Sequence, residues 1–199
     1  MFSFLQFIKE EKTKAIVAHY GKWRIPHAGY SVVTDKMHEI AKKHNADHEV
    51  SLSGADHPLT HEQKVAHARK MFPGTNISSE HHTNFLDYAS ALHKKGYNEL
   101  HMVVGSDRKK EFEDKLNKYN GKPDKSGKTL FNFKKIQVHT AGEERKEGAS
   151  GVAGSSSTQQ EKHARAGDYK SFAANAPRGA KPEHVKALYN DVRKGLVNK

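Results

Sequence analysis

Residues 14–40, KAIVAHYGKWRIPHAGYSVVTDKMHEI, contain the pattern that decides the fold. The apolar run Ala15–Ala18 is typical of a short buried strand. A basic turn, Gly21–Gly29, follows it. Apolar residues then recur at helical spacing, at Val32, Val33, Met37 and Ile40. A strand, a glycine-containing turn and a helix bring free backbone N–H groups to the positive end of a helix dipole, which favours anions. We therefore expect a nucleotide phosphate to bind here.

Composition narrows the class of protein. The 199 residues are enough for one domain with its own core. The chain has no cysteine, which excludes disulfides, a thiolate nucleophile and a cysteine-based zinc site. Its net charge of +11 favours nucleotides, nucleic acid or an acidic partner, although the same charge could serve solubility alone. No apolar run approaches the length of a membrane span, so we expect no membrane partner.

Strands and helices alternate along the chain. Strands are predicted at residues 14–20, 47–53, 76–79, 99–104 and 133–139, and helices at 29–43, 60–72, 83–95, 109–119, 158–166, 168–174 and 182–196. This alternation predicts an α/β fold: a Rossmann-like parallel sheet of about five strands with helices on both faces, plus a C-terminal helical segment. We expect a leader or docking helix at 1–12, the main domain at 13–177 and a C-terminal helix at 178–199.

Ligands of such sheets bind at the carboxyl ends of the strands, where the strand order reverses. The first turn and Gly105-Ser106-Asp107 both follow predicted strands. If those strands are neighbours at the reversal, the two turns lie side by side.

The first turn resembles the signature turn of the HxGH-class nucleotidyltransferases, the adenylyl- and cytidylyltransferases. In that family a Gly-Arg-Phe-type strand end precedes His-x-Gly-His at the start of a helix. His27-Ala28-Gly29 matches, and Tyr30 stands in place of the second histidine. The resemblance, in particular to a phage-encoded branch, continues in order through DHPLTHEQKVAHARKMFPGTNI at 56–77, YNELHMVVGSDRKKEFEDKLNKYNG at 97–121 and GVAGSSSTQQEKHARAGDYKSFAANAP at 151–177.

The resemblance implies an enzyme that transfers a nucleoside monophosphate from ATP or CTP to a phosphorylated acceptor and releases pyrophosphate. Mg²⁺ would be bound through the nucleotide phosphates. Catalytic roles would fall to His27, Tyr30 and Lys22. The nucleotide would be bound by a larger set: Gly21, Trp23, Arg24, Gly29, Gly105, Ser106, Asp107, Ser156, Ser157 and Thr158. The family resemblance is also compatible with a homo-oligomer.

The sequence departs from the signatures at Tyr30 and at Glu161, which replaces an arginine. A unit charge about 4 Å from a phosphate is worth ~4 kcal/mol at an effective dielectric near 20, so this charge reversal matters. Glu161 can pair with Arg165 at i,i+4, and Lys22, Arg24 or Lys162 could then serve the phosphates. The alternative left open is a nucleotide- or nucleic-acid-binding phage virion protein that kept the fold and lost the chemistry.

Several residues have simpler interpretations. Trp23 could be a core residue, Asp107 a helix N-cap, and Glu161 a solvated helix residue. Histidines such as His57 and His61 have no carboxylate or cysteine that completes a set, so no protein metal site is predicted.

The start of the chain points to a location. Ile8-Lys9-Glu10 resembles the cleavage site of leaders on phage head proteins, so we expect the host cytoplasm and, if the leader is cleaved after Glu10, packaging in the virion. A docked N-terminal helix is the alternative.

Overall fold

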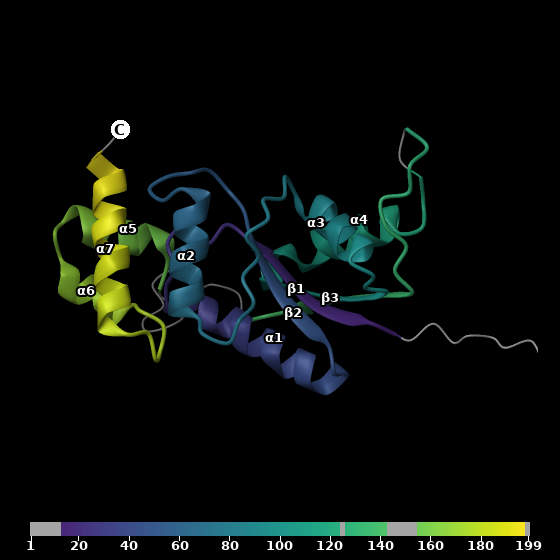
Figure 1. Cartoon of the computed structure of the whole chain (residues 1–199), viewed down its shortest axis with the longest axis horizontal. Coiled ribbons are helices and arrows are strands. Elements are labelled where there is room, and N and C mark those ends of the chain that lie inside the picture. The colour runs from purple at the N-terminus through teal and green to yellow at the C-terminus, as the bar shows by residue number, and fades with distance from the viewer. Residues whose placement is uncertain (1–12, 124–125, 143–154, 198–199) are drawn as a thin grey trace, which may run out of the picture.

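A computed structural model describes residues 13–123, 126–142 and 155–197, and in it four strands form one sheet (Figure 1). The strands are β1 (Ala15–Gly21), β2 (Asp47–Leu52), β3 (Glu99–Val104) and β4 (Lys135–Thr140). Every neighbouring pair is parallel, and the order is β2-β1-β3-β4. The chain therefore has the parallel α/β architecture that the alternating pattern predicts, with the reversal of strand order between β1 and β3.

The prediction of about five strands is one too many for the residues described. Residues 76–79 form a single parallel bridge, Val50 to Ile77, beside β2. The Val50 N–H donates to Asn76 O at 2.8 Å, and the Ser78 N–H donates to Val50 O at 2.9 Å. The described residues after Ser78 form no further pair with β2, and Ser78 Oγ accepts the N–H of Glu80 at 3.2 Å.

Seven α-helices are found in the described part of the chain. They are α1 (Ser31–His44), α2 (His61–Met71), α3 (Phe85–Lys94), α4 (Lys109–Tyr119), α5 (Ser157–Arg165), α6 (Tyr169–Ala174) and α7 (Pro182–Val197). Short 3₁₀ turns, η1 (Ala28–Tyr30) and η2 (Ser106–Arg108), precede α1 and α4. The predicted leader at 1–12 lies outside the described residues, and none of the helices described is long and apolar enough to cross a membrane.

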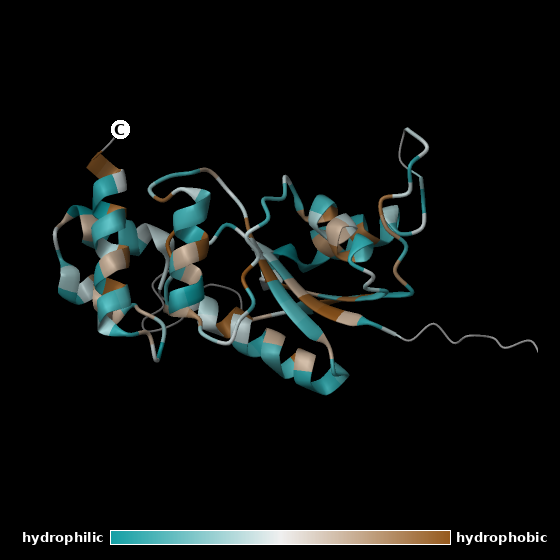
Figure 2. Ribbon diagram, in the orientation of Figure 1, coloured by the Kyte–Doolittle hydropathy of each residue, from teal (hydrophilic) through white to brown (hydrophobic). Residues whose placement is uncertain are grey.

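Two hydrophobic cores lie on opposite faces of the sheet. Alternate residues of a strand point to opposite faces, so Val17 belongs to one core and Ile16 to the other. The first core contains buried residues of α1, α2, α5, α6 and α7, whereas the second contains those of α3 and α4. Figure 2 shows the resulting pattern, with apolar residues on the strands and on the inner sides of the helices.

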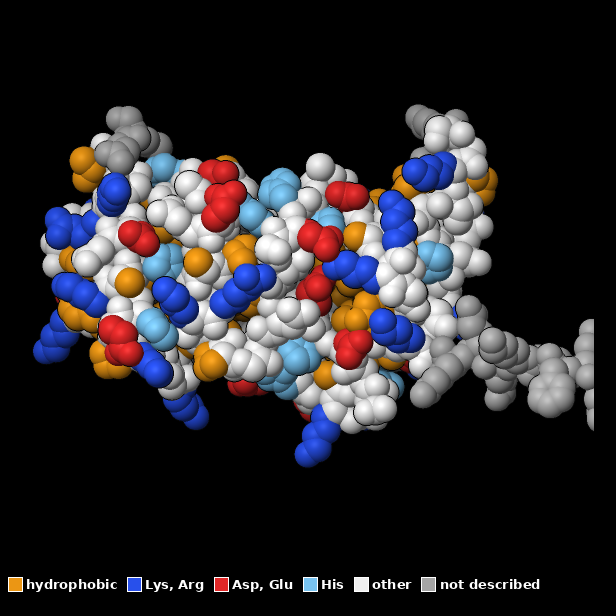
Figure 3. All heavy atoms as spheres, viewed as in Figure 1, with side chains coloured by type: hydrophobic (Ala, Val, Ile, Leu, Met, Phe, Trp, Pro, Cys, Tyr) orange, Lys and Arg blue, Asp and Glu red, His pale blue; other side chains and the backbone are white. Residues whose placement is uncertain are grey.

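Helices α5–α7 gather beyond one end of the sheet, beside α2 (Figure 1). β1 begins at the opposite end of the sheet, so its carboxyl end points toward these helices. The face shown in Figure 3 carries lysine and arginine side chains over its whole width, with carboxylates between them. The C-terminal helices therefore lie where a ligand of this fold class is expected. The face in Figure 3 shows no single basic stripe.

Candidate active site

The turns after β1 and β3 meet at the reversal of strand order. β1 and β3 are hydrogen-bonded neighbours, with Ala18 opposite Met102. Near their carboxyl ends the ring of His19 bonds to Val103 O at 2.8 Å. The first turn and the turn at Gly105 therefore leave the same edge of the sheet, as the strand pattern predicts.

The start of α5 is hydrogen-bonded to the first turn. Ser157 Oγ accepts the N–H of Ile25 and donates to the carbonyl of the same residue, both at 3.2 Å. It also lies 3.4 Å from the hydroxyl of Tyr30. A second link to this part of the chain comes from the end of α6, where Asn175 O accepts the N–H of Ala28 at 2.8 Å. The two stretches that carry the family resemblance are thus in contact, although about 130 residues separate them in the chain.

Backbone N–H groups at the start of the first helix are bonded within the protein. His27 is 1% exposed, and its Nδ1 accepts the N–H of Gly29 at 3.0 Å. The N–H of Tyr30 donates to His27 O at 3.1 Å. A Cβ on Gly29 would lie 2.8 Å from Ser155 O, so this position has no room for a side chain. A phosphate that binds here must displace the His27 ring from the Gly29 N–H.

Trp23 is a core residue. Its side chain is fully buried and stacks on Tyr30, with ring centroids 4.4 Å apart and an angle of 14°. Its indole N–H donates to His19 Nε2 at 3.1 Å. Only the backbone of Trp23 can therefore contact a nucleotide, while the Tyr30 ring supports the turn where the family has a histidine.

His19 is a buried residue of this edge that the sequence analysis did not identify. An indole N–H only donates, so Nε2 of His19 accepts and its Nδ1–H donates to Val103 O. Burial lowers the pKa of His19 to about 4. The ring is therefore neutral at pH 7 and joins β3 to the first turn.

Of the three basic residues predicted to serve the phosphates, Lys22, Arg24 and Lys162, Arg24 forms an ion pair with α5. Glu161 bonds to Arg24 at 2.9 Å and to Arg165 at 2.8 Å, so the predicted i,i+4 pair is present. Burial raises the pKa of Glu161, but the hydrogen bond from Arg165 and the charge of Arg24 outweigh it and leave the pKa lowered. Glu161 is therefore ionised. Lys22 and Lys162 are exposed. In the part of the chain that the structure describes, no ion pair is found for either lysine.

The remaining predicted residues are more accessible. Gly105-Ser106-Asp107 opens η2, where Gly105 is the N-cap and the Asp107 side chain is exposed. The interpretation of Asp107 as a helix N-cap is wrong, because Arg108 takes that position in α4. Ser156 caps α5 by accepting the N–H of Gln159 at 3.2 Å, and Thr158 is exposed in the first turn of that helix.

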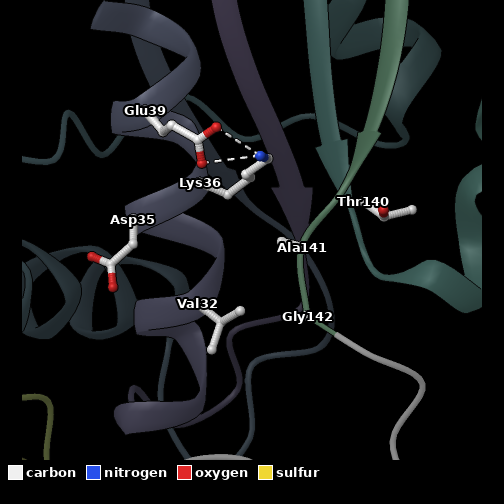
Figure 4. A pocket seen from close by; sticks show the side chains of 7 residues that line it. All are labelled: Val32, Asp35, Lys36, Glu39, Thr140, Ala141 and Gly142. Atoms are coloured by element: carbon white, nitrogen blue, oxygen red, sulfur yellow. Dashed lines mark hydrogen bonds and ion pairs between the residues drawn. The ribbon is translucent and has the colours of Figure 1, made fainter.

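A shallow groove lies between α1 and the end of β4 (Figure 4). Its volume is about 430 Å³, and it is lined by Val32, Asp35, Lys36, Glu39, Thr140, Ala141 and Gly142. Lys36 Nζ bonds to both carboxylate oxygens of Glu39 at 2.9 Å inside it. None of the predicted site residues lines the groove, but it begins two residues after Tyr30, at the same edge of the sheet.

Comparison of the chain with protein-family models finds no match, and comparison with curated proteins finds none.

Proposed function

We propose that this protein binds a nucleoside triphosphate at the carboxyl edge of its sheet and transfers the nucleoside monophosphate to a phosphorylated acceptor. The observation that carries the proposal is the junction at Ser157, whose hydroxyl holds the start of α5 against Ile25 and Tyr30. It places the N-terminus of α5 next to the start of α1, at the reversal of strand order. Helix N-termini at such an edge favour phosphate.

The transfer needs alignment and charge neutralisation rather than a covalent intermediate. An oxygen of the acceptor phosphate forms a bond to the α-phosphorus. The bond from that phosphorus to the oxygen bridging to the β-phosphate breaks, and pyrophosphate leaves. The Nε2–H of His27 and the Lys22 ammonium would stabilise the triphosphate. Mg²⁺ bound with the nucleotide, mainly through its phosphates, would supply further charge neutralisation.

Strand order suggests where the nucleoside lies. β3 separates β1 from β4, so a ligand with its phosphates on the first turn extends past Gly105–Asp107 toward the groove at Ala141–Gly142. The groove is shallow, so it would contact only one side of the nucleoside. The proposal therefore adds Val32 and Thr140 to the residues expected beside the nucleoside.

Calorimetry with ATP and CTP, in the presence of Mg²⁺, tests this site. We expect binding by the wild type that is at least tenfold weaker in His27→Ala and in Lys22→Ala. Lys181→Ala, an exposed lysine outside the site, is the control. Because His27 is buried, His27→Ala could fail to fold. In that case the ATP affinity of Lys22→Ala alone tests the site. Equal affinity in Lys22→Ala and Lys181→Ala at moderate salt would contradict the proposed site.

A second candidate function is nucleotide binding without transfer. The ion pair between Arg24 and Glu161 favours this second function. The Glu161 carboxylate stands where the family has an arginine, and it also pairs with Arg24, which could otherwise bind a phosphate. Under this alternative, wild-type protein shows no turnover with any acceptor, and the double variant Tyr30→His/Glu161→Arg gains turnover. If the wild type is active, the same double variant changes an existing rate. Pyrophosphate release over a panel of phosphorylated acceptors distinguishes the two, and no release from either protein argues against transfer altogether.

A further inference from the structure

A cluster of two histidines and a glutamate lies at the amino edge of the sheet, away from the proposed nucleotide site. Glu99 begins β3, His101 follows two residues later on the same face, and His44 ends α1. One ligand atom from each of the three side chains lies within 4.8 Å of the other two. His101 Nε2 is 2.8 Å from Glu99 Oε1, and the rings of His44 and His101 have centroids 4.2 Å apart.

A fourth residue orients the buried member of this cluster. The His101 side chain is fully buried, and its Nδ1 lies 3.0 Å from Nε2 of His139 on β4. Ligand histidines of metal sites commonly have their second ring nitrogen held by another group in this manner.

We propose that His44, Glu99 and His101 bind a transition-metal ion of the Zn²⁺ class, and that His139 is the positioning residue for His101. Two imidazoles and one carboxylate form the three-ligand set that leaves one position of a tetrahedral zinc ion to water. In such a site neighbouring ligand atoms are about 3.3 Å apart, as follows from zinc–ligand distances near 2.0 Å. The atoms of this cluster need only small movements to reach that spacing. Mg²⁺ prefers six oxygen ligands and does not fit.

Lys135 competes with a metal at this cluster. Its ammonium lies 2.9 Å from Glu99 Oε1, and its side chain is 46% exposed. A bound cation would displace this ammonium into solvent. Removing the lysine charge should therefore tighten metal binding. If the cluster served only to form the ion pair between Lys135 and Glu99, the same change would lower stability without any gain in metal affinity.

The test is titration of the full-length, untagged chain with Zn²⁺ by calorimetry and with Co²⁺ by visible absorption. We expect one saturable site per chain, with affinity at least tenfold lower in His44→Ala and in Glu99→Gln. We expect it to be unchanged in His93→Ala, a partly exposed histidine of α3, and higher in Lys135→Met. Loss of His139 as positioning residue should cost about 10–100-fold, as second-sphere partners do.

The outcome that overturns the proposal is equally specific. With 15 histidines in the chain, several weak sites of similar affinity in the wild type, His44→Ala and His93→Ala would show scattered surface binding only. His44 and Glu99 are only partly buried, and circular dichroism checks that both variants fold. If Glu99→Gln unfolds, His44→Ala alone decides. ATP affinity should be the same with and without Zn²⁺. The proposed metal site and the proposed nucleotide site can therefore be tested independently of each other.

Discussion

Glu161 brings a negative charge to the proposed nucleotide site. Its carboxylate bonds to Arg24 at 2.9 Å, so that cation is held away from a phosphate. We predict that Glu161→Gln binds ATP about tenfold more tightly than the wild type. The reason is that removing one negative charge near a phosphate, and releasing Arg24, is worth on the order of 1–2 kcal/mol after solvent screening.

The matched control for this change is Glu183→Gln, an exposed carboxylate in the first turn of α7. Calorimetry with ATP and Mg²⁺ at two salt concentrations measures both variants. Unchanged or weaker ATP binding in Glu161→Gln would show that the phosphates do not lie near α5.

His19 makes stability depend on pH. Its folded-state pKa is lowered from 6.5 to about 4, so the unfolded chain binds the extra proton first. The stability that the neutral ring contributes is present above pH 6.5 and is lost as the pH falls toward 4. We predict a loss on the order of 3 kcal/mol over that window from this residue. Urea unfolding at pH 7 and pH 4.5 should show a smaller difference for His19→Gln than for the wild type; an equal difference would contradict the assignment.

At the scale of elements, the Ser157 hydroxyl joins α5 to the first turn, beside the ion pair between Arg24 and Glu161. Ser157→Ala leaves the buried N–H of Ile25 without its partner, because that N–H donates to Ser157 Oγ. We predict a loss of about 1–3 kcal/mol in the free energy of unfolding and weaker ATP binding. Thr158→Ala changes the neighbouring, exposed residue of the same helix turn and should leave the free energy of unfolding close to that of the wild type. Denaturant titration measures the free energy of unfolding of both variants. Similar losses in the two would mean that the Ser157 hydroxyl contributes no more to stability than a surface residue does.

At the scale of the whole molecule, the charge of +11 predicts weak, salt-dependent binding to polyanions. Basic side chains are spread over the face in Figure 3 rather than gathered in a stripe, so we expect no sequence preference. Fluorescence anisotropy with single-stranded DNA should show affinity falling at least tenfold between 50 and 200 mM salt, as is typical of phosphate contacts. ATP binding should fall much less. Tight, salt-resistant DNA binding would instead favour a nucleic-acid protein over a nucleotide-binding enzyme.

Local patterns predict most of the fold. The ELHMVV run at Glu99–Val104 and the helix at Lys109–Tyr119 have the predicted boundaries, because apolar periodicity and the flanking glycines act over a few neighbouring residues. The prediction of a fifth strand at 76–79 is wrong for the described residues, which form only a single bridge with β2. Whether an edge segment becomes a strand depends on its pairing with the neighbouring strand and not on its own composition. The adjacency of the two turns was predictable, because parallel strands put their carboxyl ends on one edge.

The sequence by itself thus determined the elements, their parallel arrangement and the edge at which a ligand is expected. Only the tertiary structure decided how the side chains there are used: Trp23 lies in the core, Arg24 is taken by Glu161, and His27 is buried against Gly29. It also decided that His44, Glu99 and His101 meet at the far edge. These contacts join residues far apart in the chain, and they depend on strand register and helix packing, which no local pattern contains.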